Sequence, residues 1–529
     1  MTETFDFIVI GGGSGGSIAA SEIAAAGHSV LLLEAGQAAE ENPETLHADG
    51  YKQAFINDRL MFDRFSEPQA ALGGRRIFLG TGRGMGGSGS INAMVYTRGA
   101  REDFDAWGEG WRWDDVVPHF TDLELVLDPR RRAPTDFTER CLLASEHAGF
   151  RRKEDLNDGD LSGVLGYEWM NYRGDQRRSA YVAFIKDRSL PSLKVVTEAN
   201  VTSIGFDRSR CARKVHYQLG GAALVAEARR EIIVAAGALA SPKLLLLSGV
   251  GPGAELHGLG IDVVADSRGV GKNLHDHPNV TLFFLGKQAL DCNYPQLYGF
   301  HHVGPGTGPS DSCFVFYPAR SSFREGLMRM LPAIALSPKL YADGRGVRMI
   351  RGAIDGLFRP ALVRNFVDRM WGIVVVLGKP RSRGSLTLAS PRAADEAHID
   401  PAYLEHPDDL AVLIAGVAKA RRIAGGMSLS ALGNRELIPG IMGRGDKGVL
   451  RFIKQNIMTT YHFAGSCKMG DEGDSGAVVD RRLRVRGVSG LRVADASIIP
   501  ETPVSAMNAP SMMVGLRAAR LVLEDAGQR

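Results

Sequence analysis

A glycine-rich turn near the amino terminus constrains the fold of this chain more than any other feature. The turn is Gly11–Gly16 (GGGSGG); it follows the apolar run Phe7–Ile10 and precedes a small-residue segment, Ser17–Ala26, which Gly27 ends. A second apolar run, Val30–Leu33, comes next. This order of apolar run, tight turn, helix and apolar run predicts a βαβ unit over residues 5–36.

The glycines of the turn fit the GxGxxG pattern of dinucleotide-binding proteins. Glycine at Gly11, Gly13 and Gly16 lets the backbone turn tightly, approach a pyrophosphate and pack helix against strand, while the amides around Ser14 face the negative charge. Glu34 ends the second strand 18 residues after Gly16, where a carboxylate accepts hydrogen bonds from ribose hydroxyls and repels a 2′-phosphate. The pattern predicts an adenine dinucleotide, NAD or FAD; the alternative is a plain glycine-rich turn with a surface glutamate.

Composition excludes several other classes of protein. The chain has 529 residues, of which 44% are hydrophobic and 23% charged, and its formal net charge is +3. These values predict a globular protein of two or three domains and do not favour binding to nucleic acid. The five cysteines are widely spread and form no CxxC pair, which predicts reduced thiols, no zinc site and a cytoplasmic location. We expect neither a signal peptide nor a transmembrane segment, because no basic leader precedes the first strand and no apolar run reaches about 18 residues.

Strand and helix patterns continue along the chain. Residues 195–207 and 222–236 alternate like strands, and Ser241 and Pro242 are expected as the N-cap and first residue of a short helix. A strand at Leu491–Ala494 and a helix from about Pro510 close the chain. Because such elements lie at both ends and in the middle, we expect one discontinuous nucleotide domain with a second domain inserted into it.

Residues 321–371 contain two expected helical stretches rich in Arg, Met and Leu, separated near Gly344 and Gly346. The simplest interpretation is that these helices pack on the inserted domain. The alternatives are an amphipathic cover over a substrate cleft and a surface that touches a membrane.

Three further segments resemble the glucose–methanol–choline (GMC) oxidoreductases. Gly86–Asn92 (GGSGSIN), followed by Met94–Gly99 (MVYTRG), is similar to their first signature, and Gly237–Gly251 (GALASPKLLLLSGVG) to their second. The segments Thr460–Gly470, Val493–Ser497 and Asn508–Pro510 resemble their carboxy-terminal active-site block. The resemblance covers residues 5 to about 522 and is weakest over 290–375. It implies that the dinucleotide is FAD.

The resemblance also implies an α/β fold: an FAD/NAD(P)-binding Rossmann-like domain with an inserted α+β substrate domain built on an antiparallel sheet. We expect the FAD domain to comprise residues 1–150, 190–285 and 458–529, and the substrate domain residues 151–189 and 286–457. Beyond the GxGxxG turn, Ser14 and Glu34, the cofactor residues carried over are Gly86, Gly87, Ser88, Asn92, Ala93, Met94, Val201, Ala236, Gly237, Asp495, Ala496, Asn508, Ala509 and Pro510. Some family members attach FAD through a histidine just before this asparagine; Ile91 stands there, which predicts non-covalent FAD.

Alcohol oxidation needs a base for the hydroxyl proton and a polar group that orients the oxygen while hydride leaves for flavin N5. By resemblance, His462 is the base and Asn508 the orienting partner; Asn508 alone would also suit a helix cap. Tyr461 and Met94 are expected to shape the flavin pocket. The expected substrate is a small-molecule alcohol, and the expected electron acceptor is oxygen or a quinone-like carrier.

Other interpretations remain at this point. His275-Asp276-His277 suggests a metal site, but two histidines in a turn converge poorly, and we expect a structural role and no metal. Relatives that cleave cyanohydrins without net redox chemistry make a flavin-containing lyase the first alternative. A light-driven decarboxylase is a second alternative, against which His462 argues, and a flavin-stabilised binding protein is a third, against which the intact pair of His462 and Asn508 argues. Pyridoxine oxidases of the family are a further possible relative, but their pair is altered and Asn508 here is not.

Overall fold

The computed structural model describes residues 3–527. Its first sheet has seven strands in the order β11-β2-β1-β14-β13-β12, and β25 also pairs with β14. The strands are β1 (Glu3–Ile10), β2 (Val30–Leu33), β11 (Leu193–Val196), β12 (Asn200–Phe206), β13 (Ala212–Leu219), β14 (Ala222–Val234) and β25 (Leu491–Val493). β11, β2, β1, β14 and β25 pair in parallel, and β12 and β13 are antiparallel. The expected βαβ unit and the Rossmann-like sheet are therefore confirmed.

Two helices pack against each other beside this sheet. They are α1 (Ser14–Ala25), which follows the glycine-rich turn, and α15 (Asn508–Asp525), which ends the chain. A Cβ atom at Gly515 would lie 2.4 Å from the Gly15 carbonyl oxygen, so the two backbones approach too closely for any other residue. This contact brings the amino-terminal turn and the carboxy-terminal segment together.

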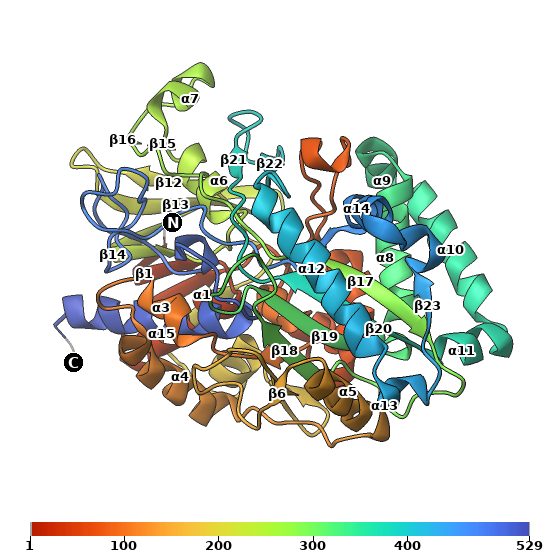
Figure 1. The fold of residues 1–529 in the computed structure, drawn as a ribbon. Helices are drawn as coiled ribbons and strands as arrows, with labels where there is room; N and C mark the ends of the chain where they lie inside the picture. The colour runs from red at the N-terminus through yellow and green to blue at the C-terminus, as the bar shows by residue number, and fades with distance from the viewer. Residues whose placement is uncertain (1–2, 528–529) are drawn as a thin grey trace.

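The second sheet has eight strands in the order β23-β17-β20-β19-β18-β7-β6, and β24 also pairs with β17. Its strands are β6 (Arg151–Arg152), β7 (Val164–Tyr167), β17 (Pro278–Leu285), β18 (Leu297–His301), β19 (Ser312–Pro318), β20 (Met370–Leu377), β23 (Arg435–Ile438) and β24 (Met458–Thr459). All pairs except β6–β7 are antiparallel. This is the expected antiparallel sheet of an inserted domain, and the helix α12 (Pro407–Ala424) packs against it (Figure 1).

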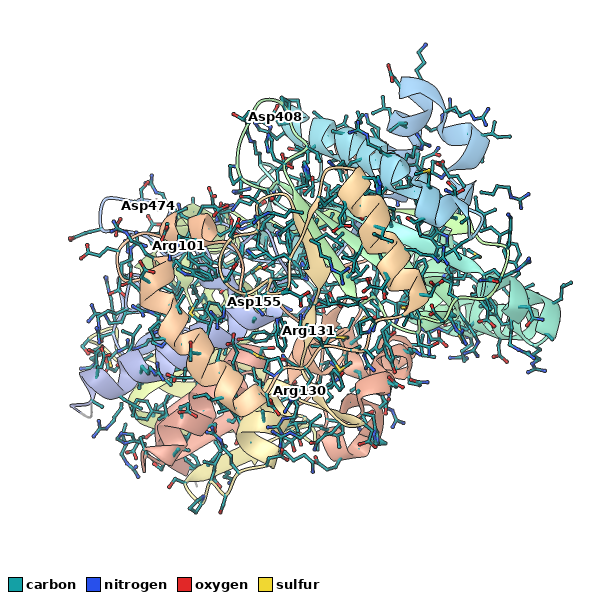
Figure 2. All side chains as sticks on the ribbon, turned by 60° about the horizontal axis from the view of Figure 1, so that its bottom comes forward. Arg101, Arg130, Arg131, Asp155, Asp408 and Asp474 are labelled. Carbon is teal, nitrogen blue, oxygen red and sulfur yellow. The ribbon has the colours of Figure 1, made fainter. Side chains whose placement is uncertain are left out.

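The helices between β19 and β20 form a layer at one edge of the molecule (Figure 1). They are α8 (Phe323–Ala335), α9 (Pro338–Asp343), α10 (Arg345–Phe358) and α11 (Ala361–Val367), so the two expected helical stretches are four helices. Elsewhere, charged side chains such as Arg130 and Arg131 lie at the surface (Figure 2). Within residues 3–527, no helix is long and apolar enough to cross a membrane.

One local prediction was wrong, and one alternative interpretation is excluded. The short helix α6 (Ser241–Leu247) includes Ser241 as its first residue, and its N-cap is Ala240, which has no side-chain cap. The hydroxyl of Ser241 instead bonds Asp495, as described below. α15 begins at Asn508, and its N-cap is Met507, so the Asn508 side chain does not cap this helix.

Candidate active site

A cavity of about 940 Å³ lies where the two sheets meet. One part is lined by the glycine-rich turn, Glu34 and the start of β12; the other by strands of the second sheet and by the segments that carry His462 and Asn508. Fifteen of the sequence-predicted site residues line it: Gly11, Gly13, Ser14, Glu34, Gly87, Ser88, Asn92, Ala93, Val201, Ala236, Gly237, His462, Asp495, Ala496 and Asn508.

Five of the predicted residues do not line the cavity but lie behind its wall: Gly16, Gly86, Met94, Ala509 and Pro510. Gly16 serves the turn itself, because a Cβ there would lie 1.9 Å from the Gly11 carbonyl oxygen. The Gly86 amide donates to the Gly12 carbonyl oxygen at 2.7 Å, which joins the two glycine-rich loops. Met94 is buried against Ala48 and Met170. These residues support the dinucleotide-binding part of the cavity, which we call the cradle, from outside the cavity.

Glu34 organises the dinucleotide part of the cavity. Its Oε2 accepts a hydrogen bond from the Gly12 amide at 2.8 Å, and its Oε1 accepts from the amides of Gly36 at 2.8 Å and Gly84 at 2.9 Å. Burial raises the pKa of the Glu34 carboxyl, and the three amides oppose that rise. The carboxylate thus fixes three loops relative to one another. This role is additional to the ribose contact that the sequence predicts.

The second glycine-rich loop meets the first turn and the last helix at one point. Ser14 Oγ donates to Asn508 Oδ1 at 2.9 Å, and a Cβ added at Gly89 would lie 2.6 Å from Ser14 Oγ. Asn92 Oδ1 accepts from the Met94 amide at 2.9 Å and from the Arg177 guanidinium at 2.8 Å. Segments far apart in the sequence therefore form one wall.

Asp495 joins the end of β25 to the loop after β14. Its Oδ2 accepts from the Gly237 amide at 2.9 Å and from the Ser241 hydroxyl at 2.5 Å, and its Oδ1 accepts from the Ser497 amide at 2.8 Å. Ser241 Oγ accepts in turn from the Ala236 amide at 3.1 Å. The Asp495 carboxylate thereby shapes the backbone around Ala236, Gly237 and Ala496.

His462 lies on the cavity wall and is held from two directions. Its backbone amide donates to Asp276 Oδ1 at 2.7 Å. Its Nδ1 lies 3.0 Å from His277 Nδ1 and 3.2 Å from Thr460 Oγ1. Burial lowers the pKa of His462 to about 4, so its imidazole is neutral at pH 7.

These contacts favour one tautomer of His462. Thr460 Oγ1 donates its proton to the His277 carbonyl oxygen at 2.5 Å, so it offers a lone pair to His462. A proton on His462 Nδ1 satisfies this contact and the one to His277, and it leaves Nε2 with its lone pair. An unprotonated ring nitrogen is what a general base requires.

The segment His275-Asp276-His277 supports His462 through backbone and side-chain contacts. Asp276 Oδ2 accepts from the Tyr403 hydroxyl at 2.5 Å, and His275 and Ala464 exchange two backbone hydrogen bonds. Within the described part of the chain, no three His, Cys, Asp or Glu residues are placed to hold a metal ion. The contact between His277 and His462 was not predicted from the sequence. The two residues are 185 positions apart, and no local pattern indicates that they meet.

The second sheet lines the rest of the cavity with Asn279, Tyr298, Val315, Val374 and Val376, among others. Cross-strand pairing places Tyr298 opposite Val315 and Gly166, and Val315 opposite Val374. Residues directly opposite in a sheet share a face, so these side chains form one largely apolar wall.

Glu168 is the residue of this wall that the sequence analysis missed. It lies two residues beyond Gly166, lines the cavity and is 2% exposed. Neither carboxyl oxygen has a hydrogen-bond partner among the described residues, and burial raises the Glu168 pKa well above its ordinary value. A lone carboxyl within the apolar run Val164–Met170 is the sequence signal that could have identified it.

We predict that Glu168→Gln stabilises the FAD-loaded protein in a pH-dependent way. Because the folded protein holds this proton more tightly than the unfolded chain, unfolding releases it, and stability falls as pH rises from the unfolded pKa towards the folded one. The variant should therefore exceed the parent by about 1 kcal/mol or more near pH 8, with a smaller gap near pH 5. Denaturant unfolding at the two pH values measures this, with exposed Glu472→Gln as the control. An equal gap at both pH values contradicts the assignment.

With this geometry in view, comparisons with known proteins decide the family. Two sequence profiles described as GMC oxidoreductase match residues 5–279 and 380–515. The chain belongs to the GMC oxidoreductase family. The oxygen-dependent choline dehydrogenase of Rhizobium etli (strain CIAT 652) is 32% identical over 567 aligned positions, covering 98% of this chain and 95% of the relative, and that of Sinorhizobium medicae (strain WSM419) is 32% identical with the same coverage.

Solved structures of the family share the fold. Pyridoxine 4-oxidase from Mesorbium loti superposes with a TM-score of 0.83 at 24% identity, covering 97% of this chain and 98% of that one. Aspergillus oryzae formate oxidase carrying a point mutation gives 0.84 at 23% identity with 99% of both chains covered, and a fungal aryl-alcohol oxidase gives 0.74 at 19% with full coverage of both. This GMC chain is a flavin oxidoreductase of small molecules, and its family implies FAD.

The residues present fit an FAD molecule. Residues of the Gly11–Gly16 turn and of the second sheet line the cavity, and bare backbone at Gly11, Gly13 and Gly87 faces it. Asn508, at the start of α15, also lines it, and the amino-terminal end of that helix favours negative charge. The turn and Glu34 would hold the adenosine part of FAD, and the part of the cavity lined by Asn92 and His462 would hold its flavin ring.

Proposed function

We propose that this enzyme oxidises an alcohol to an aldehyde or ketone. The observation that carries the proposal is that His462 and Asn508 line one cavity together with a dinucleotide cradle. When bound there, FAD supplies the hydride acceptor. Relatives named as choline dehydrogenases and an aryl-alcohol oxidase support a CH–OH donor, whereas a formate oxidase among the structural neighbours does not.

In the proposed reaction, His462 Nε2 accepts the hydroxyl proton as the α-hydrogen departs. Burial keeps the imidazole neutral before the reaction, and the hydrogen bond from Nδ1 towards His277 and Thr460 stabilises the charge that develops on it. The Asn508 amide holds the substrate oxygen, and Ser14 fixes that amide through Asn508 Oδ1. The apolar strands of the second sheet exclude water from the reacting centre.

The function is tested by adding alcohols to the FAD-loaded protein under nitrogen. A CH–OH donor should bleach the 450 nm-region absorption of the oxidised flavin and yield one carbonyl product per flavin reduced. Cleavage of a cyanohydrin without bleaching would instead identify a lyase. Repeating turnover with oxygen and with a dye distinguishes the two acceptors that we propose, oxygen and a quinone-like carrier.

We also propose that FAD is bound without a covalent link. Ile91 lines the cavity immediately before Asn92, and its side chain has no nucleophile that could attach to the flavin. Acid precipitation should therefore release all the yellow colour into the supernatant. A pellet that stays coloured after washing contradicts this prediction.

We propose a cytoplasmic compartment for the enzyme, because all five cysteines are buried and unpaired.

A further inference from the structure

The layer of helices between β19 and β20 carries surface features that the proposed reaction does not require. We call residues 319–369 the helical insert; it contains α8, α9, α10 and α11. In both views it lies at the edge of the molecule (Figures 1 and 2). Its inner side packs on the catalytic region: Met330 Sδ lies 3.6 Å from the Tyr461 hydroxyl, and Gly326 lines the cavity.

The insert concentrates positive charge. It contains ten arginine and lysine residues and four acidic residues, a net charge of +6, whereas the whole chain carries +3. The other 478 residues therefore carry −3. Two of the ten, Arg329 and Arg351, point inward to Asp58 and Asp63. Arg345 and Arg359 point outward, with 83% and 79% of their side chains exposed.

α10 is apolar on two sides. Val347, Ile354 and Phe358 are buried against the protein. Met349 and Leu357 lie on another side, and they are 71% and 57% exposed. With exposed Ala353 between them, these residues repeat every four positions, so they form one outward apolar stripe.

An arginine stripe runs beside the apolar one on α10. Arg345, Arg348 and Arg359 are exposed and, at 100° per residue, lie on the part of the helix surface between the outward apolar stripe and the buried side. An outward surface divided between long apolar side chains and arginines is typical of helices that lie in the interface of a bilayer.

The neighbouring helices also expose apolar residues. Leu331 and Ile334 are exposed on α8, and Leu362 and Phe366 are exposed on α11, with Leu362 81% accessible. Each pair is spaced three or four positions apart, so it shares a helix face. Scattered exposed leucines need no explanation, but exposed apolar pairs on three adjacent helices do.

We propose that the outer face of the helical insert docks onto an anionic lipid bilayer. The apolar residues enter the boundary between headgroups and acyl chains, and the arginines bind lipid phosphates. Negative lipid is the occupant that matches the charge, because the insert is positive and the rest of the chain is negative. Docking goes beyond the proposed reaction and places one wall of the catalytic cavity at the membrane surface.

The test is flotation of FAD-loaded protein with vesicles of phosphatidylcholine alone or with about one third phosphatidylglycerol. Protein should float with the anionic vesicles, and added salt should weaken the association. The double variant Leu357→Ser with Leu362→Ser should reduce the bound fraction about tenfold or more, and Arg348→Glu with Arg359→Glu should reduce it comparably. The matched control is Leu125→Ser, which removes a leucine on α4 (Trp113–Leu127) that is 79% exposed outside the insert.

Flavin reduction by an alcohol, measured on every variant, shows that each is folded and separates this test from the proposed function. Absence of flotation with anionic vesicles overturns the proposal, as does equal flotation with both vesicle types. So does flotation that the insert variants and Leu125→Ser alter equally. A dimer in light scattering that dissociates in the leucine variant, without vesicle binding by the parent, assigns the face to a second copy instead.

Discussion

Replacing His462 by Ala should lower kcat for alcohol oxidation roughly a hundredfold or more, the usual scale for loss of a general base. The variant should fold and retain FAD, because the contact of residue 462 with Asp276 is made by the backbone amide and not by the imidazole. The loss should appear in the rate of anaerobic flavin reduction as well as in steady-state turnover. His257→Ala, which removes an exposed histidine on α7 (Gly253–Gly258), is the control and should leave both rates unchanged.

The pH dependence of the parent enzyme provides an independent check. Burial places the His462 pKa at about 4, below that of free imidazole. The unprotonated form is the active base, so kcat/KM should stay on its high-pH plateau well below pH 6.5 and fall only as pH approaches the lowered value. Near-normal turnover of His462→Ala, or an identical pH profile in both proteins, would remove the base assignment.

The second large effect is expected for Glu34→Ala. This change leaves three buried amides, those of Gly12, Gly36 and Gly84, without their acceptor. An unpaired buried amide costs about 1–3 kcal/mol, so the free energy of unfolding should fall by about 3 kcal/mol or more. FAD affinity should fall at least about tenfold, because the three loops are no longer fixed relative to one another and the ribose hydroxyls lose their hydrogen-bond acceptor.

Denaturant unfolding and titration of the apoprotein with FAD measure these two effects. Glu41→Ala is the control, since Glu41 is exposed and its carboxylate accepts a hydrogen bond from the side chain of Gln37, outside the cavity-lining loops. If Glu34→Ala kept the stability and the FAD affinity of the parent, the Glu34 carboxylate would have no part in holding the three loops or in binding the cofactor.

Features encoded by neighbouring residues were predictable from the sequence. The apolar runs and the turn at Gly11–Gly16 specify the βαβ unit locally, and the closing strand β25 and helix α15 follow from periodicity. Local signals mislead where a tertiary partner competes: Ser241 has the chemistry of an N-cap, yet its hydroxyl bonds Asp495, 254 positions away. A side-chain oxygen with two available partners is decided by the fold and not by its neighbours.

The catalytic wall shows where sequence reasoning ends. His462 and Asn508 were identified by their resemblance to a family pattern, whereas His277 and Glu168 carried no such mark. Their importance arises from the contact between His277 and His462, and from the register that puts Glu168 beyond Gly166 on the cavity side of the sheet. Contacts across such sequence distances follow from strand order, which no local periodicity encodes.

The most direct measurement of the central claim is stopped-flow reduction of the flavin by an alcohol and by the same alcohol deuterated at its α-carbon, under nitrogen. If the α-hydrogen leaves as hydride while His462 takes the hydroxyl proton, the deuterated alcohol should bleach the flavin several-fold more slowly, and His462→Ala should slow both reactions. Product formation without bleaching, or bleaching that neither the deuterium nor the substitution slows, would contradict the account.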